Sequence, residues 1–324
     1  MSERLLVDHG IGPWIDGITT RQPDNPFVTQ AYCQARERDG DRVVGFRLGA
    51  PGSEVIAVGF VRSGRASKTC QIPTVPDVDA TSPFWPALRR WCQSTGVTKL
   101  VLDSFASRRA EIPPLGQELF RHPRWEFHLD LAAEDFGGGI SSSHRRQVKQ
   151  ATKVGMSLRV LWTAQGVAKH VELMQAAQAR RSGGTLNGPA PDQAPFRNLV
   201  EAGAGQFFQA VRSADNEVLA SVLVLRSERS GYHHSSGTHA DGAACGASHF
   251  VFFETARHLR EQGATTFNFG GVREDEEGLR TFKERFGPTT IPLVKVGFDF
   301  TPPWKRALRR AANLVARRSG PGVK

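Results

Sequence analysis

Cysteine, long apolar runs and metal-binding motifs are scarce in this sequence, and each shortage narrows the class of protein. None of the four cysteines belongs to a Cys-x-x-Cys pair. Scattered cysteines suit a reducing compartment and argue against a disulfide scaffold or a zinc site. No apolar run could span a bilayer, and the first ten residues lack the apolar core of a secretory signal. We therefore expect a soluble, cytoplasmic protein without a bound metal.

Acidic residues are missing from the C-terminal end. Residues 301–324 contain seven Lys or Arg and no Asp or Glu, which leaves +3 of the formal net charge of +10 for residues 1–300. The body is therefore close to balanced, and the high pI alone does not indicate a nucleic-acid-binding protein. The spacing at 303–318 predicts a basic amphipathic helix. Three roles stay open for it: binding an anionic membrane, contacting RNA phosphates, or docking on its own domain.

Hydrophobic periodicity predicts an α/β protein with a mixed sheet, built from two halves of similar order. We expect residues 1–123 to form the first half, residues 124–300 the second half with the active cleft, and residues 301–324 the basic tail. Residues 1–30 and 182–195 carry helix and strand breakers, so both are expected to be irregular, and 105–123 is expected to be a Pro-containing connection.

The predicted elements alternate in both halves. In the first half, strands are expected at 41–48, 54–62, 67–72 and 99–103, and helices at 27–38 and 83–93. In the second half, strands are expected at 125–131, 157–162, 206–212, 218–226, 231–236, 266–269 and 293–300. Helices are expected to end at 153 after serine N-caps, and to run over 167–181 and 246–262.

One stretch, 265–288, combines a strand, a double-glycine turn and a helix. Gly270 and Gly271 are expected to end the strand and to let a ligand approach the backbone. Lys283 follows on the helix and would add a cation beside them. Together with Asn268 on the strand, the glycines are candidate substrate-binding residues. The alternative is an ordinary strand-loop-helix connection, because Gly-Gly turns are common.

Three segments carry a resemblance to a known family. The pattern GGV, a spacer and then FKERFG in 270–287 resembles the closing segment of Fem-type (FemABX-like) peptidyltransferases, a branch of the GNAT acyltransferase superfamily. Residues 129–160 are similar to that family's segment with Asp-Leu, Ser, Arg-Arg and Gly-Val positions, and 242–263 leads from a loop into a long helix. The resemblance implies two tandem GNAT-like halves and an acyltransferase that forms an amide on an amine.

The same resemblance gives Phe282 and Lys283 a catalytic role. Acyl transfer to an amine passes through a tetrahedral oxyanion, which a fixed cation stabilises. The sequence has no Gly-x-Ser-x-Gly elbow and no evident cysteine nucleophile, so direct attack by the amine fits better than a covalent intermediate. The alternative is a surface lysine that pairs with Glu276 or Glu277.

Basic residues cluster on the helix that ends at residue 153. Arg145, Arg146 and Lys149 lie within two turns, after serines whose backbone N–H groups are free to bind an anion. They are candidates for gripping a phosphate of a nucleotide-linked substrate or of RNA, and a solvated basic face is the alternative. In Fem-type proteins a basic residue of this region resembles a contact to substrate phosphate, and Arg145 and Arg146 fit equally well.

Three histidines lie close together near the end of a predicted strand. His233, His234 and His239 match no zinc signature, so we expect no metal there. On a strand, His233 and His234 would point to opposite faces, so at most one would face a cleft. We take the three as candidate substrate-binding residues, with a structural role as the alternative.

The loop at 242–249 bears on the acyl donor. CoA-dependent GNAT enzymes usually hold the pyrophosphate there on a Gln/Arg-x-x-Gly-x-Gly/Ala loop, and this chain keeps Gly242 and Gly246 without the Arg or Gln. The resemblance therefore implies aminoacyl-tRNA as co-substrate, no cofactor, and a peptidoglycan precursor or small amino compound as acceptor. Two alternatives remain, an acyl-CoA-dependent N-acyltransferase and a non-catalytic protein that binds RNA or a membrane surface.

Overall fold

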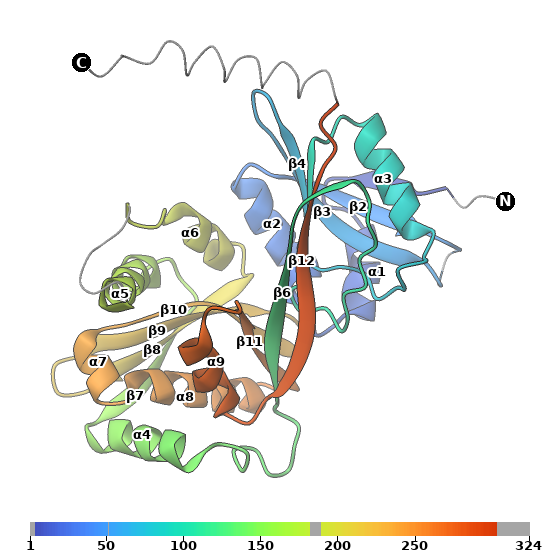
Figure 1. The fold of residues 1–324 in the computed structure, drawn as a ribbon. Helices are drawn as coiled ribbons and strands as arrows, with labels where there is room; N and C mark the ends of the chain where they lie inside the picture. Colours follow the sequence, from blue (N-terminus) through green and yellow to red (C-terminus); the bar gives the residue numbers. More distant parts are fainter. Residues whose placement is uncertain (1–3, 51, 182–188, 303–324) are drawn as a thin grey trace, which may run out of the picture.

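The computed structural model describes residues 4–50, 52–181 and 189–302 and shows one mixed sheet of twelve strands (Figure 1). The strand order is β1-β2-β3-β4-β5-β12-β6-β11-β10-β9-β8-β7. The first elements are β1 (Leu6–His9), α1 (Trp14–Arg21), η1 (Pro26–Val28), α2 (Gln30–Arg38), β2 (Arg42–Leu48), β3 (Val55–Ser63), β4 (Lys68–Ile72), α3 (Phe84–Ser94) and β5 (Lys99–Leu102).

From β7 to β11, the remaining elements repeat this order, with helices after the first strand and before the last. They are β6 (Gln117–Asp130), α4 (Ser142–Lys153), β7 (Met156–Leu161), α5 (Gly166–Arg181), α6 (Ala194–Glu201), β8 (Gly205–Arg212), β9 (Glu217–Arg226), β10 (Ser230–Thr238), α7 (Ala240–Ala244), α8 (Ala247–Glu261), β11 (Thr266–Val272), α9 (Glu277–Glu284) and β12 (Thr289–Asp299). Within the described residues, only β4–β5 and β10–β11 pair parallel, and helices connect the strands of each pair, α3 in the first and α7 and α8 in the second. The mixed α/β architecture with two similar halves is as predicted.

The two halves exchange their last strands. β6 follows the first half in the chain but pairs with β11 of the second, while β12 follows the second half and pairs with β5 of the first. β6 and β12 also pair with each other, from Thr289 opposite His128 to Asp299 opposite Gln117. The position between residues 123 and 124 therefore falls inside a continuous strand that both halves share.

This exchange creates the cleft. β5 ends at Leu102, opposite Val296 of β12, and β11 ends at Val272, opposite Trp125 of β6. Trp125 in turn faces Pro292 of β12. The carboxyl ends of both parallel pairs therefore approach the middle of the β6–β12 ribbon from opposite directions, and polar side chains that follow either strand can meet there.

The connection predicted at 105–123 is wrong in its second part, because β6 begins at Gln117. Proline normally interrupts a strand, yet Pro123 lies in β6 opposite Val294 of β12. β11 pairs with β6 only from Trp125 onward, so the strand has an open edge at Pro123, where the missing N–H removes no sheet hydrogen bond.

Residues 1–30 are not irregular, since β1, α1 and η1 lie there. α1 is only eight residues long and buries Ile15 and Ile18, a pattern too short to distinguish from a loop. α6 was also missed, although it buries Phe196, Leu199 and Val200 after a proline in its first turn. The predicted tail helix at 303–318 and residues 182–188 of the predicted loop lie outside the described residues.

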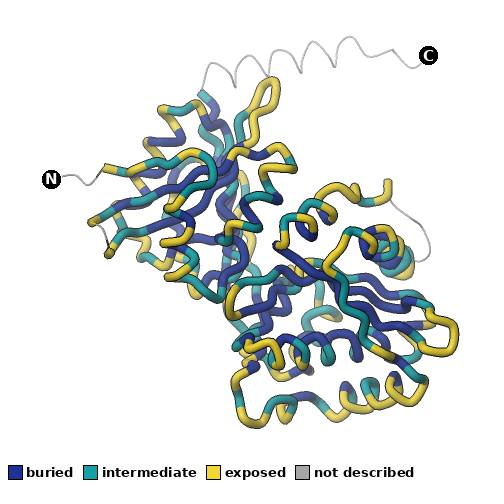
Figure 2. Tube along the Cα trace, turned by 180° about the vertical axis from the view of Figure 1, so that it is seen from behind, coloured by how far each residue is buried: buried dark blue, intermediate teal, exposed yellow. Residues whose placement is uncertain are grey.

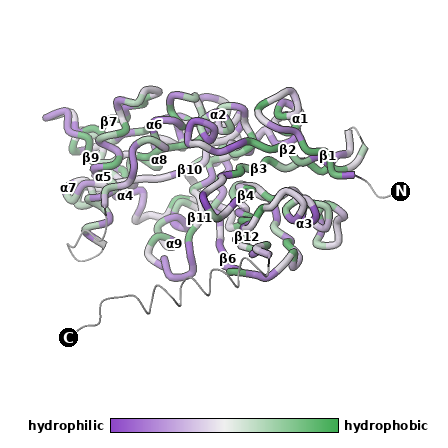
Figure 3. Tube along the Cα trace, turned by 90° about the horizontal axis from the view of Figure 1, so that it is seen from above, coloured by the Kyte–Doolittle hydropathy of each residue, from purple (hydrophilic) through white to green (hydrophobic). Residues whose placement is uncertain are grey.

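A shared core fixes the two halves against each other. One hydrophobic cluster combines Phe27, Tyr32 and Val58 of the first half with Phe207 and Leu223 of the second. A further cluster lies within the second half, and another combines the first half with Val296 and Phe298 of β12. Burial follows the strands (Figure 2). In Figure 3 the hydrophobic residues run along β2 and β3 in the first half. No helix in the described part of the chain is long and apolar enough to cross a membrane.

Candidate active site

A cavity of about 970 Å³ opens where the two parallel strand pairs end. Its walls come from both halves: Phe27 and Tyr32 near the start of the chain, Arg124 on β6, Tyr232 on β10, and the segment from Gly270 to Glu276, which forms the end of β11 and the loop after it. Lys283 of α9 also lines it. The cleft therefore depends on the relative placement of the halves that the shared core fixes.

Lys283 is buried, with 1% of its surface exposed. Its Nζ donates hydrogen bonds to the carbonyl oxygens of Gly270 (3.2 Å) and Gly271 (2.9 Å). Burial lowers the pKa of Lys283 to about 7, against the opposing effects of Glu126 and Glu276. The alternative of a surface lysine is therefore wrong, because this side chain lies in the wall of the cleft.

Gly270 and Gly271 do not end the strand, as had been expected, but form a bulge inside β11. Gly270 has φ +71°, and a Cβ placed there would lie 2.8 Å from the carbonyl oxygen of His233. The register shifts between Asn268 and Gly271, and the Asn268 side chain accepts the Gly270 N–H at 2.8 Å. Glycine is therefore required at 270, and the bulge presents two carbonyl oxygens to Lys283.

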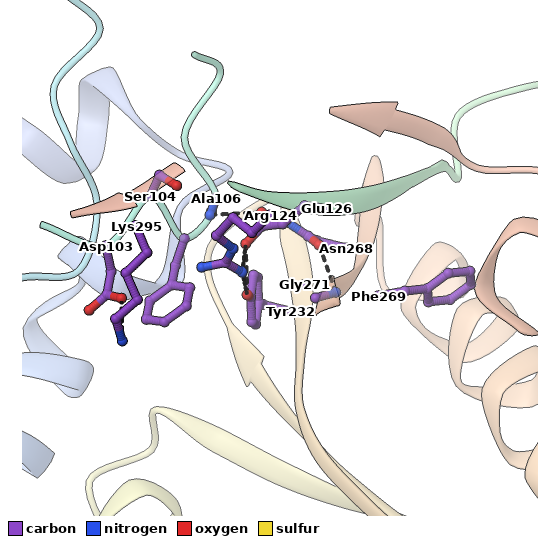
Figure 4. A network of polar contacts seen from close by, with 12 residues as sticks. Asp103, Ser104, Ala106, Arg124, Glu126, Tyr232, Asn268, Phe269, Gly271 and Lys295 are labelled. Carbon is purple, nitrogen blue, oxygen red and sulfur yellow. Dashed lines mark hydrogen bonds and ion pairs between the residues drawn. The ribbon is translucent and has the colours of Figure 1, made fainter. Parts of the chain in front are cut away.

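Glu126 is the centre of a buried polar network beside this bulge (Figure 4). The carboxylate is fully buried and accepts hydrogen bonds from Arg124 (2.8 Å), Tyr232 Oη (2.8 Å) and Asn268 Nδ2 (2.7 Å). Burial alone would raise the pKa of Glu126, but the hydrogen bonds and nearby positive charge hold it below its ordinary value. Glu126 is therefore ionised and joins β6, β10 and β11.

Arg124 is held against the cleft wall on three sides. Its guanidinium lies 4.4 Å from the centre of the Phe105 ring, and its Nη2 binds Glu126 and, at 3.4 Å, Tyr232 Oη. A side chain at Gly271 would collide with this guanidinium. Nε and Nη1 form no hydrogen bond with the described residues, so Arg124 can still donate to an anionic ligand.

A second cation stands at the end of the cleft that faces the first half. Lys295 of β12 forms an ion pair with the buried Asp103 at 3.0 Å, and Gln71 donates to the other Asp103 oxygen at 2.7 Å. Lys295 and Gln71 both line the cavity. With Lys283, Arg124 and Arg273, four basic residues line the cleft, together with the acidic loop residues 274–276. Lys283 and Arg124 are the least exposed of the four, so they suit a substrate that carries or develops negative charge.

The histidines differ from the prediction. His233 and His234 both line the cavity, because a β-bulge begins at His233 and breaks the alternation of faces. His233 Nδ1 lies 3.0 Å from the Phe269 carbonyl oxygen, and burial, followed by the charge of Lys283, lowers its pKa well below the ordinary value. His233 is therefore neutral. His239 caps α7 and does not line the cavity.

The structure does not bring the basic helix to the cleft. Arg145, Arg146 and Lys149 are exposed on α4, which packs on α8, and none of them lines the cavity. Phe282 is likewise absent from the cavity wall. It packs on Phe252, and its carbonyl oxygen lies 3.0 Å from His144 Nε2, so it anchors the helix that carries Lys283.

Sequence reasoning missed Arg124, Glu126, Tyr232 and Lys295. The sequence did contain one signal, the ionisable residues Arg124, Glu126 and His128 at alternating positions along and just before a predicted strand. These side chains share one face of the strand, and a buried glutamate there requires polar partners. Among the described residues, no group of three or more His, Cys, Asp or Glu side chains could hold a metal ion.

Comparisons with known proteins agree with this geometry. Residues 140–284 match the family model described as "Acetyltransferase (GNAT) domain". A search of curated proteins found no match. The solved structure of FemX is similar over 94% of this chain and 99% of its own, with a TM-score of 0.66 and 15% identity.

Two further structures share the fold over nearly their whole length. A tandem GNAT protein from the clavulanic acid biosynthesis pathway has a TM-score of 0.55 at 11% identity, covering 92% of this chain and 99% of its own. L-PGS from Bacillus licheniformis has a TM-score of 0.53 at 12% identity, covering 94% and 97%. Residues 140–284 thus match a GNAT acyltransferase domain, which supports an acyltransferase activity, and the chain as a whole shares its fold with FemX.

Proposed function

We propose that this protein transfers an aminoacyl group from aminoacyl-tRNA to an amine and so forms an amide. The acceptor amine attacks the ester carbonyl carbon, a C–N bond forms, and the C–O bond to the tRNA ribose breaks. The proton lost by the amine passes to the departing ribose hydroxyl. Peptidoglycan precursors and small amino compounds are the acceptor classes that the Fem-like fold suggests.

Lys283 would stabilise the oxyanion of this reaction. A protonated lysine has three N–H donors, and two of them are used on the carbonyl oxygens of Gly270 and Gly271. The third remains for the developing charge. Neutral Lys283 would have no donor left, so the role requires the protonated form and a pH near or below its pKa of about 7.

The packing of α4 on the N-terminus of α8 is the observation that favours aminoacyl-tRNA over acyl-CoA as the donor. In CoA-dependent GNAT enzymes, the pyrophosphate occupies the N-terminus of this helix. Here a Cβ on Gly246, the first residue before α8, would lie 2.6 Å from the Gln147 carbonyl oxygen of α4. Gln150 of α4 also donates to the Ala244 carbonyl oxygen at 3.4 Å. α4 therefore packs closely against the start of α8, which supports a donor other than CoA.

A donor comparison tests the proposal. The purified protein is incubated with charged tRNA and a panel of amines, and amide products are measured by mass spectrometry. We expect products that ribonuclease abolishes and that acetyl-CoA does not support. Because the matching family model is an acetyltransferase domain, acetyl-CoA is the donor to compare. Amide formation from acyl-CoA without RNA would overturn the tRNA donor and leave acyl transfer intact.

The role of Lys283 is tested in the same assay. Lys283→Ala should lower turnover by about 10²–10³-fold, the usual effect of losing one oxyanion donor. Arg280→Ala removes an exposed cation from the same helix and is the matched control. Activity of Lys283→Ala close to that of the wild type, with Arg280→Ala also active, would contradict the assignment.

A further inference from the structure

The helix α4 lies in a segment that has no acidic residues. Residues 136–171 contain six Lys or Arg and no Asp or Glu. Because residues 1–300 carry +3 in total, the rest of that range carries −3. The positive charge of the body is therefore concentrated in this one segment, and a protein with its charges separated in this way attracts a polyanion to one side.

Four of the six cations lie on one face of α4. They are Arg145, Arg146, Lys149 and Lys153, and all four are exposed. An α-helix turns by about 100° per residue, so the four side chains fall within an arc of about 100°. The buried residues of α4, His144 and Ala151, lie on the opposite side, where the helix packs on α8. The four cations, which we call the basic face of α4, therefore point to solvent.

The basic face of α4 is not neutralised by the protein. None of its four side chains forms a hydrogen bond or an ion pair with a residue that the structure describes. Other exposed arginines of the same half are paired with two acidic residues each, as Arg212 and Arg257 are. A cluster of cations without acidic partners on one helix is the electrostatic pattern of a nucleic-acid-binding surface.

Arg285 extends the basic face toward the helix that carries Lys283. Arg285 is the C-cap of α9 and is exposed, and its carbonyl oxygen accepts the Ser141 N–H at 2.8 Å, just before α4 begins. Burial, and to a smaller extent the charge of Arg285, lowers the pKa of His144, which places the guanidinium near the first turn of α4. A polyanion on α4 would therefore also reach the end of α9, two residues beyond Lys283.

The size of the cleft shows why a donor tRNA needs a surface outside it. A cavity of about 970 Å³ has the volume of a small-molecule site. It can admit the 3′ end of a tRNA, where the ester lies, but not the helical stem that follows. The stem must lie on the outside of the protein, and the phosphates of that stem require cations.

We propose that the basic face of α4, together with Arg285, binds the phosphate backbone of the tRNA stem. This inference rests on the proposed tRNA donor and adds a contact surface outside the cleft. Contacts between cations and phosphates position an RNA without reading its sequence. The stem would therefore be held at α4 and α9 while its 3′ end reaches Lys283.

An anionic membrane is the other polyanion that such a face could meet. Interfacial helices insert an apolar face among the lipid head groups. The aliphatic residues of α4 are Val148 and Ala151, and both lie on the side that faces the protein. Val154, after the helix, is a single exposed valine. α4 thus has cations but no apolar face to insert, which favours RNA.

Binding of uncharged tRNA to the full chain tests the surface without any chemistry. Fluorescence anisotropy gives Kd at several salt concentrations. Arg145→Gln/Lys149→Gln removes two exposed cations, and glutamine keeps the helix propensity. We expect this double variant to bind tRNA about tenfold more weakly or worse. The slope of log Kd against log salt concentration should fall by about two, because each phosphate contact contributes about one.

The matched control removes the same charge elsewhere. Arg89→Gln/Arg90→Gln changes two exposed arginines of α3, which lies in the other half, far from α4 (Figure 1). It should bind tRNA as the wild type does. Equal losses in the two double variants would overturn the proposal, because tRNA would then respond to net charge alone. Wild-type tRNA binding by the α4 variant, with weaker binding to phosphatidylglycerol vesicles, would assign the face to a membrane instead.

A kinetic comparison separates the surface from the proposed reaction. With charged tRNA, the α4 variant should have a KM raised about tenfold and a kcat close to that of the wild type. With an aminoacylated oligonucleotide too short to reach α4, the difference in KM should disappear. Transfer by the α4 variant with the wild-type KM for charged tRNA would refute the surface and leave the reaction intact. Binding of tRNA that depends on α4, without transfer from any charged tRNA, would support the surface and refute the reaction.

Discussion

At the scale of single residues, burial decides what each cleft cation can do. Lys283 is almost excluded from water and exchanges its proton near pH 7, whereas Arg124 keeps its charge under any condition. Arg124 therefore suits binding of a permanent anion. Lys283 suits a reaction step in which a negative charge develops on the substrate and is then lost.

The lowered pKa of Lys283 makes stability depend on pH. The unfolded lysine has a pKa near 10.5 and the folded one about 7, so between these values unfolding takes up a proton. Stability should therefore rise as pH increases from 7 to 10.5. In denaturant titrations across this range, Lys283→Met should show a smaller rise. An identical slope in both proteins would mean that the folded lysine keeps its proton.

Glu126 should be a main contributor to stability. Glu126→Gln removes the charge that compensates Arg124 while keeping the shape, and we expect a loss of about 3–5 kcal/mol in the free energy of unfolding. Glu118→Gln breaks an exposed pair with Arg121 on the same strand and is the control, for which no measurable change is expected. Chemical denaturation compares them, and similar small losses in both would show that the network is not stabilising.

The sequence predicted Lys283 because a local motif surrounds it. Arg124 and Glu126 were not predictable in the same way, since a charged residue in a strand normally faces solvent, and Tyr232 and Asn268, which complete their network, are about 100 or more residues away in the chain. The two histidines were misplaced for a local reason. The β-bulge after His233 changes the face of the sheet on which the next side chain lies. No residue type in this segment of β10 predicts a bulge.

At the scale of elements, β11 and α9 work as a pair. The bulge turns two carbonyl oxygens toward α9, and Lys283 binds both of them. The carbonyl of Phe282, one residue earlier, contacts His144 of α4. α9 is thus anchored on both sides of the lysine, which fixes the cation in place.

Gly270 tests this pairing. Gly270→Ala introduces a Cβ at positive φ and against the His233 carbonyl oxygen, so we expect a loss of about 1–3 kcal/mol and impaired turnover. Gly278→Ala in α9 has open space and ordinary φ, so it should leave stability unchanged or slightly higher. Thermal unfolding and activity of the two variants provide the comparison, and a harmless Gly270→Ala would refute the steric argument.

Long elements with a clear period were predictable, and short ones were not. α3, α5, α8 and most strands of both halves follow their hydrophobic pattern to within a few residues. The exceptions are β1, which was not predicted, and β6, which begins eight residues before the predicted strand. α1 and α7 have eight and five residues, so their period cannot be separated from that of a loop.

At the scale of the whole molecule, each half lacks its own last strand. The open side of β5 is filled by β12, and β6 fills the gap between β12 and β11. The halves can therefore not separate as domains do without breaking the sheet.

Divided chains test this interdependence. We expect fragments 1–135 and 136–324 to be insoluble or unfolded when produced alone, because each exposes an unpaired strand edge. Produced together, they should form a one-to-one complex with the circular dichroism spectrum of the intact protein. Size-exclusion chromatography distinguishes these outcomes. A folded monomer of either fragment would show that the exchanged strand is dispensable.

The exchanged strands also set a schedule for folding on the ribosome. β5 is complete by residue 102, but its partner β12 is not synthesised until residues 289–299. Contacts between such distant segments form slowly, and nascent chains grow at about 5–20 residues per second. The first half must therefore wait roughly ten seconds or more with an open sheet edge, and during that time β5 can pair with a wrong strand.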